Sequence, residues 1–139
     1  MKEHIKILGS KKQRITKQRI LVLDVLKKAG SPVSVKEISE KVNGKMNLST
    51  VYRNLIELEK SKIVSRVNID KDMSFFEFRN KEDDHHHHIV CSGCKKIEEV
   101  QICEIDNYLK KVLSRSKNFK KLSSHSLELF GTCKKCATK

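Results

Sequence analysis

Apolar residues recur at helical spacing in the first half of the chain, and each such segment has a recognisable start. Thr16 can cap a first helix, which is predicted to run to Ala29 and to stop at Gly30-Ser31-Pro32. Ser34 and Glu37 have the spacing of a capping box, in which a hydroxyl and a carboxylate satisfy backbone N–H groups at the start of a second, short helix. The pattern therefore predicts two successive helices separated by a tight turn.

The next segments predict a third helix and a β-hairpin. Ser49 can cap a helix over residues 49–60, and the apolar residues of that helix fall on one face, namely Val51, Leu55 and Leu58. Residues 63–69 and 74–78 alternate between apolar and polar side chains, as half-buried strands do, on either side of a turn at 70–72. Three helices followed by a two-stranded hairpin predict a winged helix-turn-helix.

The second half of the chain predicts a small mixed domain. Residues 85–91, 97–100 and 122–130 are predicted as strands, and residues 104–116 have the apolar spacing of an amphipathic helix. A sheet of this size with one helix buries little apolar surface, so we expect it to pair with a second copy. The expected fold is α+β, with an N-terminal winged-helix domain over residues 1–80 and a small α/β dimerisation domain over residues 81–139.

The charge of the chain indicates what class of partner the protein binds. The 139 residues include 30 Lys and Arg against 17 Asp and Glu, a formal net charge of +13, and residues 1–80 hold 18 of the basic and 9 of the acidic residues. This balance favours a polyanionic partner, of which nucleic acid is the first candidate. No apolar stretch approaches the roughly 20 residues that span a bilayer, and the N-terminus has no signal-peptide pattern. We therefore expect a soluble cytoplasmic protein without a membrane partner.

A winged helix binds double-stranded DNA by placing the helix after the turn in the major groove while basic residues hold phosphates. Hydroxyl and amide groups can bond base edges or phosphates, an arginine can address guanine, and a tyrosine ring can pack on a thymine methyl. The alternative is that these side chains form ordinary solvated helix faces. The residues expected to contact DNA are Arg14, Lys17, Arg19, Ser49, Thr50, Tyr52, Arg53 and Asn54.

Cysteines supply the sharpest chemical signal. Four of the five form two C-x-x-C pairs, Cys91 with Cys94 and Cys133 with Cys136. Two such pairs about 40 residues apart can present four thiolates to one tetrahedral zinc ion. Disulfides are disfavoured in an intracellular chain, and thioredoxin-like redox chemistry explains one pair but not a second. A Cys₄ site has no open position for water, so its zinc would hold the fold together rather than catalyse a reaction.

Four consecutive histidines at residues 85–88 precede the end of the strand at Cys91. Side chains alternate between the two faces of a strand, so His86 and His88 point one way while His85 and His87 point the other. One run can therefore serve two metal sites. A purification tag is disfavoured because the run is internal, and a purely solvated run is the remaining alternative.

Taken together, four motifs resemble the ferric uptake regulator family. They are Thr16-x-Gln18-Arg19-Ile20, Ser49-Thr50-Val51-Tyr52-Arg53-Asn54-Leu55, His85-His86-His87-His88-Ile89-Val90-Cys91-x-x-Cys94, and His125-Ser126-Leu127-Glu128-Leu129-Phe130-Gly131-x-Cys133-x-x-Cys136. The resemblance covers nearly the whole chain and implies a homodimeric, metal-dependent transcriptional regulator, usually a repressor, that binds a palindromic operator and is not an enzyme. By similarity, Tyr52 and Arg53 read the major groove, and Arg14 holds the place of a basic residue that probes the minor groove.

The resemblance also implies three metal sites. It places structural zinc on Cys91, Cys94, Cys133 and Cys136, the regulatory metal on Glu77, His86, His88 and Glu99, and a second metal on His85, His87, Asp106 and His125. The division of the histidines agrees with the strand faces. One departure is that Pro32 stands where the family often has a further His ligand, which leaves Glu77 as the only matched ligand from the first half. His4 or the carboxylates of residues 82–84 are the candidates to replace that ligand.

The identity of the regulatory metal stays open between Zn²⁺ and Fe²⁺, because mixed imidazole and carboxylate ligands suit both. Cys103 resembles a Cys of the zinc uptake regulator branch, although a small apolar residue at a helix start is an equal interpretation. Glu99 argues against the peroxide-sensing branch, which tends to have Asp there. The alternative functions are a peroxide sensor of the same family and a metal-storage or chaperone protein that uses the His run. A zinc hydrolase is disfavoured because no Pro precedes either C-x-x-C pair.

Overall fold

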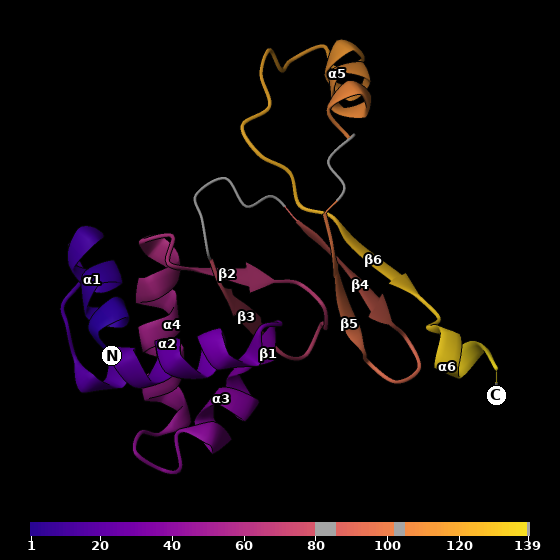
Figure 1. Ribbon diagram of the computed structural model, residues 1–139. Coiled ribbons are helices and arrows are strands. Elements are labelled where there is room, and N and C mark those ends of the chain that lie inside the picture. Colours follow the sequence, from indigo (N-terminus) through magenta and orange to yellow (C-terminus); the bar gives the residue numbers. More distant parts are fainter. Residues whose placement is uncertain (80–85, 102–104, 139) are drawn as a thin grey trace. The chain divides into compact units, whose positions relative to one another are not determined.

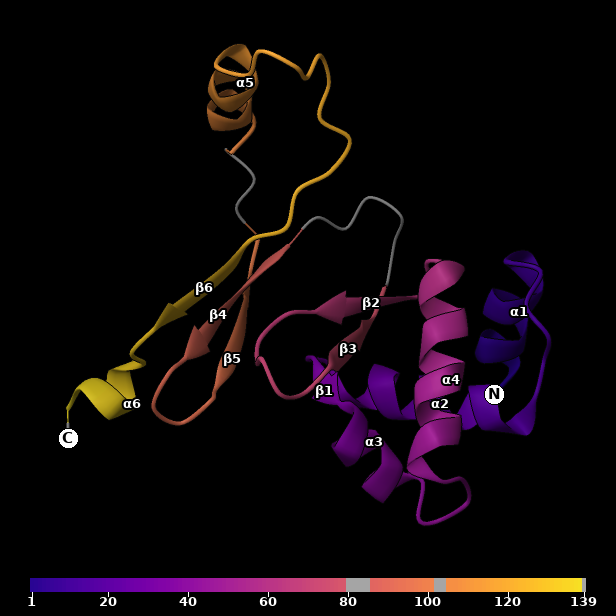
Figure 2. The ribbon, with the colours of Figure 1, turned by 180° about the vertical axis from the view of Figure 1, so that it is seen from behind.

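The structure is a computed structural model that describes residues 1–79, 86–101 and 105–138. It divides into two compact units, Met1–Glu82 and Asp83–Lys139. Figure 1 shows the helices and strands of each unit, and Figure 2 shows the same elements from behind. Each unit contains both helices and strands, so the α+β prediction is confirmed.

The first unit is a winged helix-turn-helix with one further helix at its start. Strands β1, β3 and β2 form an antiparallel sheet in that order. The sequence pattern predicts neither α1, which buries just two side chains, nor β1, which is two residues long. In chain order the elements are α1 (Lys2–Ser10), α2 (Lys17–Ala29), β1 (Val33–Ser34), α3 (Val35–Lys41), α4 (Leu48–Lys60), β2 (Val64–Val67) and β3 (Phe75–Phe78).

Helices α2 and α3 begin at the predicted capping residues. The Thr16 hydroxyl accepts a hydrogen bond from the backbone N–H of Arg19 at 3.2 Å, and α2 ends at Gly30, whose φ of 64° is one that glycine adopts without strain. Ser34 and Glu37 form the complete capping box, because each side chain accepts from the backbone N–H of the other at 3.1 and 3.0 Å. The two predicted caps are confirmed.

Helix α4 begins earlier than the sequence predicts. Its cap is Asn47, whose Oδ1 accepts from the backbone N–H of Thr50 at 2.9 Å, so the prediction that Ser49 caps this helix is wrong. Asparagine serves as a helix cap as well as serine does, and here the preceding turn ends at Asn47. Ser49 therefore lies in the first turn of α4, where its side chain is exposed.

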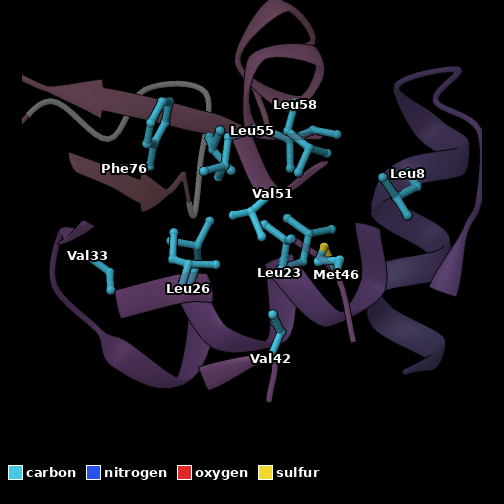
Figure 3. Packing of buried hydrophobic residues seen from close by; sticks show 14 residues of the cluster. Leu8, Leu23, Leu26, Val33, Val42, Met46, Val51, Leu55, Leu58 and Phe76 are labelled. Atoms are coloured by element: carbon cyan, nitrogen blue, oxygen red, sulfur yellow. The ribbon is translucent and has the colours of Figure 1, made fainter. Parts of the chain in front are cut away.

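The core of the first unit is apolar and closely packed (Figure 3). Val51, Leu55 and Leu58 are fully buried, so the predicted inner face of α4 is confirmed. Phe76 of β3 and Leu8 of α1 are fully buried as well. This core holds α4 by one face and leaves the opposite face exposed to solvent.

The second unit is built on a small mixed sheet. Strand β4 lies between β5, to which it is antiparallel, and β6, to which it is parallel. The predicted strand over residues 122–130 is regular only at its end, and α6 is a four-residue helix that the sequence pattern does not predict. None of the residues of α5 is buried. The elements are β4 (His87–Cys91), β5 (Ile97–Val100), α5 (Asp106–Ser114), β6 (Glu128–Gly131) and α6 (Lys134–Ala137).

Among the residues that the structure describes, none of the helices is both long and apolar enough to cross a membrane.

Candidate metal centre and nucleic-acid interface

Four cysteines gather at one end of the sheet in the second unit. Cys91 ends β4 and Cys94 lies in the turn that follows it, while Cys133 caps α6 and Cys136 belongs to that helix. Strands β4 and β6 are parallel neighbours, with Cys91 opposite Gly131. Because parallel strands end at the same edge of a sheet, the two C-x-x-C pairs meet there despite their separation in sequence.

The sulfur atoms have the spacing of a tetrahedral zinc site. The four Sγ atoms lie within 4.8 Å of one another, and those of Cys94 and Cys133 are 3.7 Å apart. Four sulfurs placed about 2.3 Å from one zinc ion would be about 3.8 Å from each other. None of the four cysteines is in a disulfide. The donor atoms and their spacing therefore fit structural Zn²⁺.

The thiols of this cluster differ in acidity. Hydrogen bonds from the backbone N–H groups of Cys133, Cys94 and Gly93 lower the pKa of the Cys91 thiol to about 6. The close sulfurs of Cys133, Cys94 and Cys91 raise the pKa of the Cys136 thiol to about 12. One thiolate thus forms readily at neutral pH, whereas four together need a cation, and metal binding must release protons.

His86, His88 and Glu99 lie close together in the same unit. His88 is directly opposite Glu99 in the ladder between β4 and β5, and the rings of His86 and His88 meet edge to face with centroids 5.0 Å apart. Nδ1 of His86 is 4.0 Å from Oε1 of Glu99. The structure therefore brings together these three predicted regulatory ligands, while Glu77 belongs to β3 of the first unit.

His87 lies near a different histidine. Its ring centroid is 5.4 Å from that of His125, and His87 is buried. Asp106 is the first residue of α5 and is exposed. The structure thus brings together two of the four residues predicted for the second metal. The fourth, His85, lies outside the described residues, as do Cys103 and the acidic run at 82–84.

The exposed face of α4 carries the predicted DNA-reading side chains. Ser49, Tyr52 and Arg53 are exposed, whereas Thr50 and Asn54 are half-buried. The Asn54 amide donates to the carbonyl of Thr50 at 2.9 Å. This bond uses one of the two amide hydrogens, so the other hydrogen and the amide oxygen are the groups that can address DNA.

Sequence reasoning missed Arg66 on β2. Its Nη2 lies 3.3 Å from Oε2 of Glu59 and 3.5 Å from the Tyr52 hydroxyl, and its guanidinium carbon is 5.8 Å from the Tyr52 ring centroid and 5.1 Å from that of Phe76. The Arg66 guanidinium thus donates a hydrogen bond to Tyr52, which is predicted to contact DNA, and also makes a cation–π contact with its ring. The linear pattern holds no signal for this contact, because it depends on how β2 packs beside α4.

Sequence reasoning also missed a hollow beside the predicted readers. It has a volume of about 560 Å³ and lies between the starts of α3 and α4 and the hairpin turn. Tyr52 and Arg53 line one side, and Leu48 and Met73 add apolar surface. The exposed surface at the start of α4 is therefore concave and mixed in polarity.

The basic residues before and within α2 are placed differently from one another. Arg14 and Lys17 are exposed, whereas Arg19 is half-buried. Nη1 of Arg19 donates to Oε1 of Gln13 at 2.8 Å and to the backbone carbonyl of Arg14 at 3.0 Å. Arg19 therefore contacts the segment that carries Arg14.

Comparison with known proteins agrees with this arrangement. The ferric uptake regulation protein of Helicobacter pylori is 36% identical over 124 residues, which are 87% of this chain and 80% of that protein. The zinc uptake regulation protein of Mycobacterium tuberculosis is 30% identical over 126 residues, 88% of this chain and 94% of that protein. The solved structure of the Helicobacter pylori ferric uptake regulator, described as revealing three functional metal binding sites, superposes with a TM-score of 0.75 at 33% identity and covers 97% of this chain and 90% of that one.

The model of the family described as "Ferric uptake regulator family" matches residues 10–130, which include the capped helices of the first unit, the cluster of His86, His88 and Glu99, and the first C-x-x-C pair, and which end before Cys133. The alignments with the Helicobacter pylori protein and with its solved structure extend over most of the length of each. The chain therefore belongs to the ferric uptake regulator family of metal-responsive transcriptional regulators.

Proposed function

We propose that this protein is a cytoplasmic, homodimeric repressor that binds a palindromic operator in double-stranded DNA when its regulatory metal is bound, and that it is not an enzyme. The observation that carries the proposal is the combination, in one chain, of a helix with an exposed polar face and two separate groups of metal-ligating side chains. The first unit would bind DNA, and the second would bind metal and pair with a second copy.

The DNA-binding part of the proposal rests on α4 and on charge. Ser49, Tyr52 and Arg53 are exposed on a helix whose opposite face is locked in the core. Such a helix can enter the major groove, where hydroxyl, aromatic and guanidinium groups address base edges and phosphates. Arg14 and Lys17 supply exposed positive charge in the same unit. Binding should weaken steeply with salt, because each phosphate contact releases a counterion.

The structural metal would be Zn²⁺ held by Cys91, Cys94, Cys133 and Cys136. The spacing of the sulfurs and the N–H groups that bond the Cys91 sulfur support this assignment. Zinc at this place supplies folding free energy, about 10–16 kcal/mol in small zinc peptides. A site with four protein sulfurs leaves no position for a reactive water, which supports a regulator over a hydrolase.

His86, His88 and Glu99 would hold the regulatory ion, and the family resemblance adds Glu77. The regulatory ion, when bound, supplies ligand bonds that favour the DNA-binding state over the inactive state. To move the population from about 1% to about 99% active, the two states must differ about 10⁴-fold in metal affinity, or about 5.5 kcal/mol. Three or four ligands can provide a difference of this size.

Pairing with a second copy is supported by exposed apolar side chains in the second unit. Tyr108, Val112 and Phe130 are 65%, 45% and 58% exposed, and none of the residues of the amphipathic helix α5 is buried. A helix with an apolar face gains stability when another surface covers that face. Light scattering after size-exclusion chromatography should therefore give the mass of a dimer.

Zinc or ferrous iron would act as the regulatory metal, since two imidazoles with carboxylates suit both ions. Operator binding measured against buffered concentrations of Zn²⁺, Fe²⁺ and Mn²⁺ would separate these possibilities. A peroxide sensor would lose DNA binding after treatment of the iron-loaded protein with hydrogen peroxide, and we expect binding to persist. A metal-storage protein would not bind duplex DNA with a steep salt slope, and we expect this protein to do so.

Glu99 and its neighbour Glu98 offer a matched test of the regulatory site. Both lie on β5, but Glu99 is opposite His88 whereas Glu98 is opposite Ile89, on the other face of the sheet. We expect Glu99→Ala to raise the metal concentration for half-maximal operator binding by at least roughly 10- to 100-fold, because loss of a group that only supports the ligands already costs that much. Glu98→Ala should leave that concentration unchanged.

The measurement is fluorescence anisotropy of a labelled palindromic duplex, with a mild chelator that leaves the Cys₄ zinc in place as the metal-free reference. Equal metal dependence of the two variants would contradict the assignment of Glu99. Equal DNA affinity with metal and with chelator, in the unmodified protein, would contradict the proposed switch as a whole.

A further inference from the structure

The segment between α1 and α2 carries Arg14 and is held in one conformation by its own backbone and by a side chain of α2. The N–H of Lys12 donates to the carbonyl of Gly9 at 3.1 Å, and the N–H of Gln13 donates to that of Leu8 at 2.8 Å. Lys12 adopts a φ of 54°, an uncommon value for a residue other than glycine. Such a turn needs support from outside the segment.

Arg19 supplies that support through one nitrogen. Both acceptors of its Nη1, the Gln13 side chain at 2.8 Å and the Arg14 carbonyl at 3.0 Å, belong to this segment. A terminal guanidinium nitrogen carries two hydrogens, so both are used within the chain. The side chain of Arg19 is half-buried while that of Arg14 is exposed.

Gln13 extends this network to the far end of α4. Its Nε2 donates to the Ser61 hydroxyl, and the same hydroxyl donates to the carbonyl of Glu57 at 2.9 Å. Since arginine can only donate, Gln13 must turn its oxygen to Arg19, which leaves its nitrogen for Ser61. The hydrogen-bond pattern is therefore consistent at every atom, and it connects Arg14 to the helix that carries Tyr52.

We propose that Arg19 is a positioning residue for Arg14, not a phosphate ligand, and that Arg19, Gln13 and Ser61 together set where Arg14 meets the minor groove relative to α4. This inference rests on the proposed DNA binding and on the minor-groove role that the family resemblance implies for Arg14. A held backbone carries less conformational entropy into the complex, so an arginine on it loses less on binding. The contact of Arg14 then depends on Arg19 although Arg19 itself touches no DNA.

The test is a double-mutant cycle between Arg14 and Arg19. The probe is a palindromic duplex that the protein selects from random DNA, with flanks carrying either inosine–cytosine or guanine–cytosine pairs. These two pairs differ by the guanine amino group in the minor groove, so the part of the affinity ratio that depends on Arg14 reports minor-groove contact. We expect the unmodified protein to prefer inosine by roughly tenfold, the scale of one base-specific contact.

Arg14→Ala should abolish that preference, and Arg19→Ala should reduce it to less than about twofold. In the Arg14→Ala background, Arg19→Ala should change neither affinity nor salt slope, because the residue through which it acts is gone. Lys17→Ala is the matched control. As an exposed phosphate ligand, it should keep the inosine preference and lower the salt slope by about 0.9 in both backgrounds.

Three results would overturn the inference. One is an Arg19→Ala protein that keeps the preference for inosine. Another is a loss of operator affinity from Arg19→Ala that is the same with and without Arg14→Ala, together with a further decrease of about 0.9 in the salt slope. Both are expected of a phosphate ligand. The last is an unmodified protein with no preference, since Arg14 would then have no minor-groove contact to be positioned for.

A second variant and a measurement without DNA distinguish failure of this inference from failure of the proposed function. Ser61→Ala removes the far end of the network without touching charge, and it should weaken the inosine preference in the same direction. Hydrogen exchange at the Lys12 and Gln13 amides should be faster in Arg19→Ala and unchanged in Gln18→Ala, an exposed neighbour on α2. Unchanged exchange in Arg19→Ala overturns the inference even if the protein binds no DNA, whereas failure to bind any duplex overturns the proposed function alone.

Discussion

Replacing Gly93 by alanine should weaken the binding of zinc to the cysteine cluster. Gly93 lies within the first C-x-x-C pair, and a Cβ atom built on it would meet Sγ of Cys136 at 3.2 Å, Cβ of Cys136 at 3.7 Å and Sγ of Cys91 at 3.8 Å. Favourable contacts between heavy atoms lie at roughly 3.5–4.0 Å. The Cys136 sulfur would therefore have to retreat by a few tenths of an ångström.

Whether the sulfur can retreat depends on the metal. In the metal-free protein, rotation about the Cys136 side-chain bonds relieves the contact at little cost. With zinc bound, the sulfur is fixed about 2.3 Å from the ion and the contact remains. Added methyl groups in closely packed sites cost about 1–3 kcal/mol, which corresponds to a loss of zinc affinity of roughly 5- to 150-fold.

Gly131 is the matched control for this prediction. It pairs with Cys91 across β6 and β4, yet an added Cβ there meets nothing within 4 Å. Gly131→Ala should leave zinc affinity unchanged and raise the free energy of unfolding by about 0.4–1 kcal/mol, because alanine restricts the unfolded chain. The two substitutions have the same chemistry but opposite expected effects on the metal-bound protein.

The assay is competition for zinc with a chromophoric chelator near neutral pH, reported as the ratio of zinc dissociation constants of the variant and the unmodified protein. A Gly93→Ala protein that binds zinc within twofold of the unmodified protein would refute the reasoning, because Cys136 would then not stand where a bound ion holds it. An equal loss in Gly131→Ala would show instead that the effect is not specific to the cluster.

Three further perturbations test the first unit. Leu55→Ala, at a fully buried site, should lower the free energy of unfolding by about 2–5 kcal/mol in urea denaturation without changing the m-value, and a Leu55→Met protein should lose less than about 1.5 kcal/mol. The hydrogen bond from Lys28 lowers the pKa of Asp24 below its ordinary value of 3.8. The pair therefore stabilises the protein at pH values above 3.8, and this stabilisation is lost as the pH falls through the lowered pKa. An NMR titration of the Asp24 carboxyl should show the lowered pKa, and an ordinary pKa would contradict the prediction. Arg66→Met removes the bonds to Tyr52 while still filling the space beside it, and operator affinity should fall by roughly 2- to 10-fold as that ring becomes less ordered; unchanged affinity would mean that Arg66 does not support Tyr52.

Features coded by nearby residues could be predicted from the sequence. The caps of α2 and α3 depend on side chains three positions apart, and the inner face of α4 follows from the spacing of Val51, Leu55 and Leu58. The two C-x-x-C pairs predict one cluster because four thiolates have few other stable uses in such a chain. Alternation along the histidine strand likewise separates His86 and His88 from His87, and the structure sets His87 beside His125.

Features that depend on tertiary packing could not be predicted. Helix α1 lacks a capping side chain bond and is stabilised by burying His4 and Leu8 against the rest of the unit. The sequence alone does not determine the cap of α4, because Asn47 and Ser49 are both good caps and the choice between them depends on where the preceding turn ends. His4, a sequence candidate for the missing regulatory ligand, is buried beside Asp24, with Nε2 and Oδ1 3.7 Å apart.

Charge alone predicts one role, contact with DNA, for three basic residues for which we propose different roles. Arg14, Lys17 and Arg19 lie within six positions and all count toward the positive charge of the first unit. Exposure and hydrogen bonding separate them, because Arg14 and Lys17 are exposed while Nη1 of Arg19 is committed to Gln13 and the Arg14 backbone. The sequence thus gives the number of basic residues in a segment. Which of them are available to bind phosphate depends also on the hydrogen-bond acceptors that each guanidinium already has inside the protein.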